Sequence, residues 1–584
     1  MKALKYLNKY FKKYRYRLAL GITFSIIAQV FALVTPRLIG QSLKVVEQYQ
    51  KGQINDLADV KHQLLINIVI IIGAIIAAGI FTFGMRQMII VMSRYIEFDL
   101  KNEIYEQYQR LSLNFYKKNK TGDLMNRISE DVSKVRMYFG PAIMYSINML
   151  TLFIVVISNM VRIDLQLTLY TLIPLPFLSA AIYILSSVIN KRSTIVQQYL
   201  SKLTAYAQET FSGINVIKAY GIESKNYDEF DDLANISKEK NISLFKAQAL
   251  FFPLMILLIG MSNVFVIYFG GMQYISGKIE SLSIIAEFII YINMLTWPVA
   301  VVGWVSSMVQ QAEASQKRIN EFLEVKPEIE NNQLNPNKIN GTIAFKNVSF
   351  IYDDTNITAL KNVSFKIEAG KTLAILGKTG SGKSTIINLM ARLYDIDKGT
   401  ILIDRIPIKE INLKNLRESI GFVPQDSFLF SDTIANNIRF GDEEATSDSI
   451  INAAKQANIH QNIADFKNNY QTLVGERGVT LSGGQKQRVS IARALIKDSN
   501  ILILDDCLSA VDTETEEKIL SNLNKLIHHK TAIIVSHRAS SVKNADTIIV
   551  LDEGRVIQTG THLELVNIPG YYQDLYNHQS AEHV

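Results

Sequence analysis

The stretch Gly377-Lys378-Thr379-Gly380-Ser381-Gly382-Lys383-Ser384-Thr385 decides the fold of the C-terminal half of the chain. It follows an apolar run at 372–376, which predicts a buried strand, and it opens a predicted helix. Glycines in such a loop let backbone N–H groups converge on phosphate oxygens, and the helix N-terminus adds positive potential. Lys383 is then expected to reach the β- and γ-phosphates, while the Ser384 hydroxyl can bind Mg²⁺. The loop predicts an NTPase.

Further motifs around this loop narrow the prediction. Leu481-Ser482-Gly483-Gly484-Gln485 begins 98 residues after Lys383 and precedes a predicted helix, so it too exposes N–H groups at a helix N-terminus. The apolar strand 501–504 delivers Asp505 to the Mg²⁺ side of the phosphates, and Asp506 follows it. Tyr352 precedes the loop and is placed to stack on a base. The remaining candidates lie after predicted strands or turns: Gln425, Ser509, Asp512 and His537.

The N-terminal half consists of long apolar runs. A helix that spans a bilayer needs ~20 residues with few charges. Six charge-free stretches meet this requirement: 18–36, 63–85, 137–161, 165–190, 247–277 and 288–312. We therefore predict an all-α transmembrane domain of six helices over 1–324. A polar, asparagine-rich linker at 325–341 follows, and strands alternating with helices predict an α/β P-loop NTPase cassette over 342–584.

Basic residues are concentrated at the N-terminus and in two of the predicted loops. The chain has 61 Lys and Arg against 54 Asp and Glu, a net charge of +7. The first 17 residues carry seven basic residues and no acid, with Tyr and Phe interleaved, which is typical of a membrane-surface element and not of nucleic-acid binding. The loops 91–136 and 191–246 carry nine and eight basic residues and should be long helical extensions. Because basic loops stay cytoplasmic, we expect the N-terminus, both loops and the cassette on the cytoplasmic side of the inner membrane.

Cysteine usage excludes two further classes of protein. The chain has one cysteine, Cys507, so it has neither an internal disulfide framework nor a zinc site built from cysteines. Cys507 is expected to be a small buried residue. Soluble ATPases of DNA repair and chromosome structure that share these two motifs place a long coiled coil between them, and the 98 residues here leave no room for one.

At these residues the sequence resembles the ATP-binding cassette (ABC) family, and six spans before one cassette resemble an exporter-type half-transporter. The resemblance covers nearly the whole chain and includes Thr121–Leu124 with Arg127 and Asp131, and Glu209–Gly213 with Ile217–Tyr220. In this family those loops carry coupling helices that touch the cassettes. The resemblance implies a dimer that sandwiches two ATP molecules, each between one chain's phosphate loop and the other chain's Leu481–Gln485 signature.

The resemblance also implies roles for the individual residues. The ATP-binding set is Tyr352, Gly377, Thr379, Gly380, Ser381, Gly382, Lys383, Ser384 and Thr385. The signature residues expected to contact the partner's ATP are Ser482, Gly483, Gly484 and Gln485. The Mg²⁺ set is Ser384, Gln425 and Asp505, the catalytic set is Asp506, His537 and Gln425, and the D-loop residues are Ser509 and Asp512.

Asp506 departs from the family pattern, because active members usually carry Glu at this position as the base for the attacking water. The Asp carboxylate falls short by about 1.5 Å, one C–C bond. A misplacement of ~1 Å can cost ~100-fold in rate. We therefore expect a heterodimer, in which this chain resembles the degenerate-site half of bacterial multidrug or lipid exporters and a different partner carries Glu. The alternative is a homodimer that tolerates Asp506, and the intact His537 favours it.

The function expected from these observations is ATP-driven export of a hydrophobic or amphipathic compound, a drug or a lipid, by alternating access across the membrane. The expected partners are a second half-transporter, membrane lipid and a small hydrophobic substrate, without nucleic acid. An alternative is an ATP-gated channel or a regulatory subunit with little turnover of its own, which Asp506 would suit.

Overall fold

The computed structural model describes residues 2–331, 333, 335–475, 478, 480–507, 513–527 and 530–581. The chain divides into two compact units. The first comprises Met1–Gln109 and Gly122–Val325, and the second comprises Arg110–Thr121 and Lys326–Val584. The short segment Arg110–Thr121, which the sequence places in the membrane domain, thus groups with the cassette.

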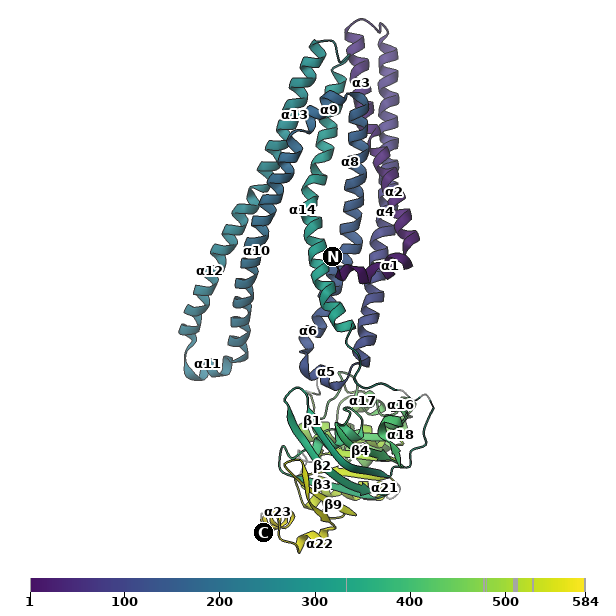
Figure 1. Cartoon of the computed structure of the whole chain (residues 1–584), viewed down its shortest axis with the longest axis vertical. Coiled ribbons are helices and arrows are strands. Elements are labelled where there is room, and N and C mark those ends of the chain that lie inside the picture. The colour runs from purple at the N-terminus through teal and green to yellow at the C-terminus, as the bar shows by residue number, and fades with distance from the viewer. Residues whose placement is uncertain are drawn as a thin grey trace. The chain divides into compact units, whose positions relative to one another are not determined.

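The first unit is all-helical (Figure 1). Its helices, in chain order, are η1 (Ala3–Leu7), α1 (Asn8–Lys13), α2 (Arg15–Ala32), α3 (Val34–Gln50), α4 (Leu57–Arg110), α6 (Thr121–Asn126), η2 (Arg127–Asp131), α7 (Val132–Met137), η3 (Tyr138–Ala142), α8 (Ile143–Ile163), α9 (Leu165–Leu172), α10 (Pro174–Ser212), α11 (Ile214–Tyr220), α12 (Glu223–Ala249), α13 (Phe251–Ile275) and α14 (Ser283–Leu323). Pro174 begins α10, where its missing N–H costs nothing. Asp164 caps α9 by accepting a hydrogen bond from the backbone N–H of Leu167.

Five stretches among the described residues are long and apolar enough to cross a membrane: Arg15–Gln50, Leu57–Arg110, Thr121–Ile163, Glu223–Ile275 and Ser283–Leu323. They cover five of the six predicted spans, apart from the last two residues of 247–277. The remaining one, 165–190, forms α9 and the first part of α10, and it stays a prediction as a span.

The predicted long extensions are confirmed as helix. Helix α4 runs unbroken for 54 residues, about 80 Å, which is far longer than a bilayer core is thick. Helices α10 and α12 lie side by side, and α11 closes their far end (Figure 1). At the end of η2, the buried Asp131 carboxylate accepts hydrogen bonds from Ser315 and Arg318 of α14.

The second unit is the α/β cassette (Figure 1). Its strands are β1 (Ile343–Tyr352), β2 (Ile357–Ile367), β3 (Thr372–Gly377), β4 (Lys398–Ile403), β5 (Ile406–Pro407), β6 (Ile420–Val423), β7 (Ile501–Asp505), β8 (Thr531–Val535), β9 (Thr547–Asp552) and β10 (Arg555–Gly560). Its main helices are α5 (Leu113–Lys118), α15 (Lys383–Met390), α16 (Leu413–Glu418), α17 (Ile434–Arg439), α18 (Ser447–Gln456), α19 (His460–Ala464), α20 (Gly483–Leu495), α21 (Thr513–Ile527), α22 (His562–Val566) and α23 (Tyr571–Ala581).

Two sheets organise this unit. The larger has the order β10-β9-β3-β8-β7-β6, in which every pairing except β10 with β9 is parallel. The strands β7 and β8 are buried along their whole length, as strands covered on both faces require. The second sheet, β2-β1-β4-β5, is antiparallel and was not predicted.

The asparagine-rich stretch predicted as a linker is held on the cassette. Asn412, the N-cap of α16, donates its side-chain amide to the Gln333 carbonyl, 2.6 Å. Its backbone N–H donates to the Asn337 side chain, 3.1 Å. Further on, Asp404 accepts hydrogen bonds from the backbone of Asn340 and Thr342. The side chains of this stretch therefore serve as hydrogen-bond partners where regular structure ends.

Candidate nucleotide site

The order of strands in the larger sheet determines which motifs lie together at the candidate nucleotide site. In a parallel sheet the carboxyl ends of all strands meet at one edge, and ligands bind there. Strand β3 ends at the phosphate loop, its neighbour β8 leads to His537, and the next strand β7 ends at Asp505. Strand β6 lies beyond β7 and leads to Gln425, which is exposed. Four motifs far apart in sequence are thus brought to one edge.

The glycines of the phosphate loop allow backbone to approach backbone. Gly377 has φ +148°, and a Cβ there would lie 2.2 Å from the Leu551 carbonyl oxygen. Gly382 has φ +102°, and a Cβ there would lie 2.5 Å from the Ala359 carbonyl oxygen. Both positions therefore require glycine for space as well as for conformation. The Ser381 hydroxyl is buried in the loop without a hydrogen-bond partner among the described residues, as expected where a phosphate oxygen is to be held.

Lys383, the first residue of α15, fills the loop. Its side chain is 6% exposed, and Nζ donates to the carbonyls of Gly377 (2.7 Å) and Lys378 (2.8 Å). Burial lowers the pKa of Lys383, against the opposing fields of Asp506 and Asp505. A buried ammonium whose hydrogen bonds go to loop carbonyls is poised to bind a polyanion, since charge-assisted hydrogen bonds strengthen in a desolvated site.

Two carboxylates face this ammonium. Asp505 is 7% exposed and hydrogen-bonded to the Ser384 hydroxyl, and burial raises its pKa. Carboxylate and hydroxyl oxygens are ligands that Mg²⁺ prefers, so this pair fits the predicted metal position. Asp506 has φ +43°, a conformation that Asp tolerates better than most residues, and its N–H donates to the Val535 carbonyl. Burial raises the pKa of Asp506, while His537, Lys383 and Arg538 oppose the rise.

His537 completes the group around the loop. Burial and the nearby Lys383 lower its pKa, so the imidazole stays neutral at physiological pH. A neutral imidazole can donate one hydrogen bond to a phosphate without adding charge.

The signature motif forms a separate, open element. Ser482 caps α20: its hydroxyl accepts from the Gln485 N–H (3.3 Å), and its own N–H donates to the Gln485 side chain (2.9 Å). This capping box fixes the first turn. Ser482 and Gly483 are exposed, so the N-terminus of a 13-residue helix faces solvent. Such an end attracts anions.

Tyr352 stands at the end of β1, where its hydroxyl lies 3.1 Å from the Thr385 hydroxyl. The other partner of the Tyr352 ring, Lys117, could not be predicted from the sequence. Lys117 of α5 places its ammonium 4.1 Å from the centre of the Tyr352 ring and 5.2 Å from that of Tyr394. The same segment is held by Ser112 and Asn114, which both donate to Glu328. A residue 235 positions upstream therefore lies on the ring predicted to stack on a base.

The other predicted residues divide into two groups. Cys507 is buried within the cassette core, and burial raises its pKa to about 12, so it is a packing residue as predicted. Ser509 and Asp512 lie outside the described residues.

Comparisons with known proteins follow the same division of the chain. The family model "ABC transporter transmembrane region" matches residues 18–299, and the model "ABC transporter" matches residues 360–509. Multidrug resistance-like ATP-binding protein MdlA of Escherichia coli (strain K12) is 34% identical, with 100% of this chain and 97% of that protein covered. The chain belongs to the ABC transporter family.

Two further relatives place this ABC transporter among exporters. The ATP-dependent lipid A-core flippase of Syntrophus aciditrophicus (strain SB) is 35% identical over 83% of this chain and 80% of that protein. The solved structure of a bacterial Atm1-family ABC exporter with ATP bound is 26% identical, with a TM-score of 0.79, and covers 97% of this chain and 99% of that one. The chain is thus a multi-pass membrane protein with an exporter fold, whose cassette binds ATP and couples its hydrolysis to transport.

Proposed function

We propose that this chain is one half of a dimeric exporter that uses ATP to move a hydrophobic or amphipathic compound, a drug or a lipid, out of the cytoplasm or the inner leaflet. The observation that carries the proposal is the contrast within one cassette between a filled phosphate loop and an exposed signature helix. A signature whose anion-binding end faces solvent needs a phosphate presented by a second cassette. Two copies of this surface, or one copy and a related one, complete each other.

Each residue around the nucleotide would have its own role in binding or hydrolysis. Lys383 would exchange its loop carbonyls for the β- and γ-phosphates, and Ser381 would donate its hydroxyl, which has no hydrogen-bond partner in the described part of the chain. Ser384, Asp505 and Gln425 would hold Mg²⁺, which neutralises phosphate charge when bound. Asp506 would orient the attacking water, and His537 would hold the γ-phosphate. The Ser482 hydroxyl and the Gly483 and Gly484 amides would bind the partner's γ-phosphate.

The dimer is supported by apolar surfaces that the chain leaves exposed. Around α11, Phe211 is 73% and Tyr220 is 78% exposed. In the cassette, the side chains of Phe428 and Phe430 are also exposed. Exposed aromatic patches of this kind mark interaction sites. The coupling helices of a partner are suitable occupants of the cassette patch at Phe428 and Phe430. They would transmit closure of the cassettes to the membrane helices.

For the composition of the dimer we favour a different partner that carries Glu at the position of Asp506. Asp506 would then make this chain's own site slow, while the intact signature completes the partner's faster site. We also infer that the N-terminus and the cassette lie on the cytoplasmic side of the inner membrane, which the basic loops support.

Uphill transport is the test of the proposal. Inside-out vesicles that contain the chain and any co-purifying partner should accumulate a fluorescent amphiphile against its gradient when ATP is added. The Gly484→Asp variant, which should damage the partner's faster site, should abolish this accumulation. Flux that only runs down the gradient would favour the ATP-gated channel and would contradict the exporter.

Native mass spectrometry of the gently extracted complex tests the composition. A dimer with a second, different cassette chain is expected. A dimer of this chain alone would mean that Asp506 serves both sites, and the asymmetric mechanism would be wrong.

A further inference from the structure

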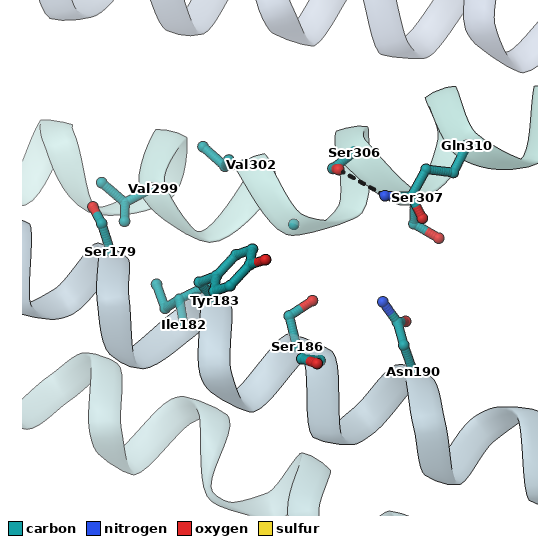
Figure 2. Close-up of a pocket in the computed structure, with 12 residues that line it drawn as sticks. Ser179, Ile182, Tyr183, Ser186, Asn190, Val299, Val302, Ser306, Ser307 and Gln310 are labelled. Atoms are coloured by element: carbon teal, nitrogen blue, oxygen red, sulfur yellow. Dashed lines mark hydrogen bonds between the residues drawn. The ribbon is translucent and has the colours of Figure 1, made fainter. Parts of the chain in front are cut away.

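The helical unit contains a cavity of about 380 Å³ between α10 and α14 (Figure 2). This volume lies within the range of roughly 300–1,000 Å³ that small-molecule sites occupy. Helix α10 lines it with Ser179, Ile182, Tyr183, Ser186, Ser187 and Asn190. These positions follow steps of three and four residues, which place them on one face of the helix.

Helix α14 lines the opposite wall with the same spacing, through Val299, Val302, Gly303, Ser306, Ser307 and Gln310. Figure 2 shows Ser179 close to Val299 at one end and Asn190 close to Gln310 at the other, so the two helices run in the same direction along the cavity. A Cβ at Gly303 would lie 3.4 Å from the Ser186 hydroxyl, so the glycine keeps the cavity open where the walls approach.

The polarity of the walls changes along the cavity. One end is formed mainly by Ile182, Val299 and Val302. The other end carries hydroxyl and amide groups from both helices: Ser186, Ser187, Asn190, Ser306, Ser307 and Gln310. Among the residues drawn in Figure 2, the only hydrogen bond joins Gln310 Nε2 to the Ser306 hydroxyl, at 3.4 Å. The Ser307 hydroxyl accepts a hydrogen bond from Gln311 Nε2, at 3.1 Å. The side chains of Ser186, Ser187 and Asn190 on α10 have no hydrogen-bond partner among the described residues, so these three groups are available to a ligand.

None of the twelve lining residues is Asp, Glu, Lys, Arg or His. A charged headgroup in this cavity would lose its hydration without gaining an opposite charge, which is costly at membrane depth. An uncharged group with several hydroxyls or amides would instead exchange water for the serine, asparagine and glutamine side chains. The polar end, at Asn190 and Gln310, falls at the cytoplasmic ends of the predicted spans 165–190 and 288–312.

We propose that this cavity binds the uncharged, hydroxyl- or amide-bearing headgroup of an amphiphile, whose apolar part lies along Ile182, Val299 and Val302. The proposal rests on the proposed export function and names the class of its substrate. It places the headgroup of the ligand at the level of the cytoplasmic leaflet, and the ligand's apolar part then points toward the middle of the bilayer.

Binding to the purified complex in nanodiscs, without ATP, tests the proposal. The probes are an NBD-labelled monoglucosyl diacylglycerol, which is uncharged, and an NBD-labelled phosphatidylglycerol with the same acyl chains. We expect the uncharged probe to bind at least tenfold more tightly. Asn190→Leu and Ser306→Val should each weaken its binding roughly fivefold, the effect of one lost hydrogen bond. Ser306→Thr, which keeps the hydroxyl, should retain the affinity.

A charge placed in the cavity provides a gain-of-binding test that does not depend on loss of stability. Ser307→Lys should improve binding of phosphatidylglycerol and weaken that of the glucosyl lipid. Equal binding of both probes by the unmodified complex, or affinities that none of these substitutions changes, would overturn the proposal. The vesicle experiment decides the export function separately: ATP-driven accumulation together with unchanged binding in these variants would reject the cavity and leave the exporter intact.

Discussion

The two phosphate-facing elements of the cassette are built in opposite ways. The phosphate loop is closed on itself: Lys383 is buried, is held by two carbonyls of the loop and faces two acids. The signature is fixed only by its own capping box, and its residues face solvent. The first element binds a nucleotide within its own cassette, whereas the second is useful only to another cassette. The two elements should therefore respond differently to substitution.

The largest effect is expected from Gly484→Asp in the signature. A carboxylate in the first turn stabilises a helix, so α20 should stay folded, but it repels the phosphate that the helix N-terminus should attract. Loss of one such anion-binding group costs roughly 100- to 1,000-fold in rate, and the added charge favours the upper value. ATP turnover at the partner's site should fall accordingly, as measured by phosphate release from the complex. Gly484→Ala is the control, and full turnover in Gly484→Asp would refute the role of the signature.

Asp506→Glu sharpens the comparison in the opposite direction. The longer side chain should bring the carboxylate to the attacking water and raise turnover at this chain's own site by up to ~100-fold. The Gly484→Asp background isolates this effect, because that substitution silences the partner's site. Asp506→Asn, which lacks a carboxylate, should give no gain.

The same background separates the two kinds of dimer. In a homodimer, Gly484→Asp would silence both sites, and Asp506→Glu would restore nothing. Unchanged turnover of the complex after Asp506→Glu alone would leave the slow-site hypothesis without support.

Lys383→Ala should weaken ATP binding at this chain's own site by roughly 30-fold, because it removes a charge-assisted hydrogen bond. Photolabelling with 8-azido-ATP, resolved by chain, measures the two sites separately. The partner's site should keep its affinity, since it uses this chain's signature and not its phosphate loop. Lys378→Ala is the matched control, because that side chain is exposed and only its carbonyl contacts Lys383. Equal losses at both sites would contradict the asymmetry.

The sequence was sufficient for the parts of the site that depend on local pattern. Short apolar runs predicted β3 and β7, and parallel pairing with β8 between them brings Lys383, Asp505 and His537 to one edge. The glycine pattern predicted the phosphate loop. The structure explains why this pattern is reliable, because there is no room for a side chain at Gly377 or Gly382.

Contacts between distant segments could not be predicted in this way. The antiparallel sheet depends on the register of β1 against β2 and β4, which includes irregular steps that no periodicity reveals. The grouping of Arg110–Thr121 with the cassette depends on single side chains such as Lys117, whose basic character only indicated a cytoplasmic loop. The facing stripes of α10 and α14 are each visible as helical spacing, but their juxtaposition requires the fold.

The smallest expected effect concerns this contact between Lys117 and Tyr352. An ammonium 4.1 Å from the ring centre gains about 0.5–1 kcal/mol from a cation–π interaction at a partly exposed site. If a base stacks on the ring face that Lys117 covers, this interaction must be given up when ATP binds. Lys117→Met removes the charge while keeping an unbranched chain, so ATP should bind about threefold more tightly at this chain's site. Lys117→Arg keeps the cation and should leave the affinity unchanged. Photolabelling with 8-azido-ATP measures both variants, and weaker binding in Lys117→Met would mean that the lysine supports the nucleotide and does not compete with it.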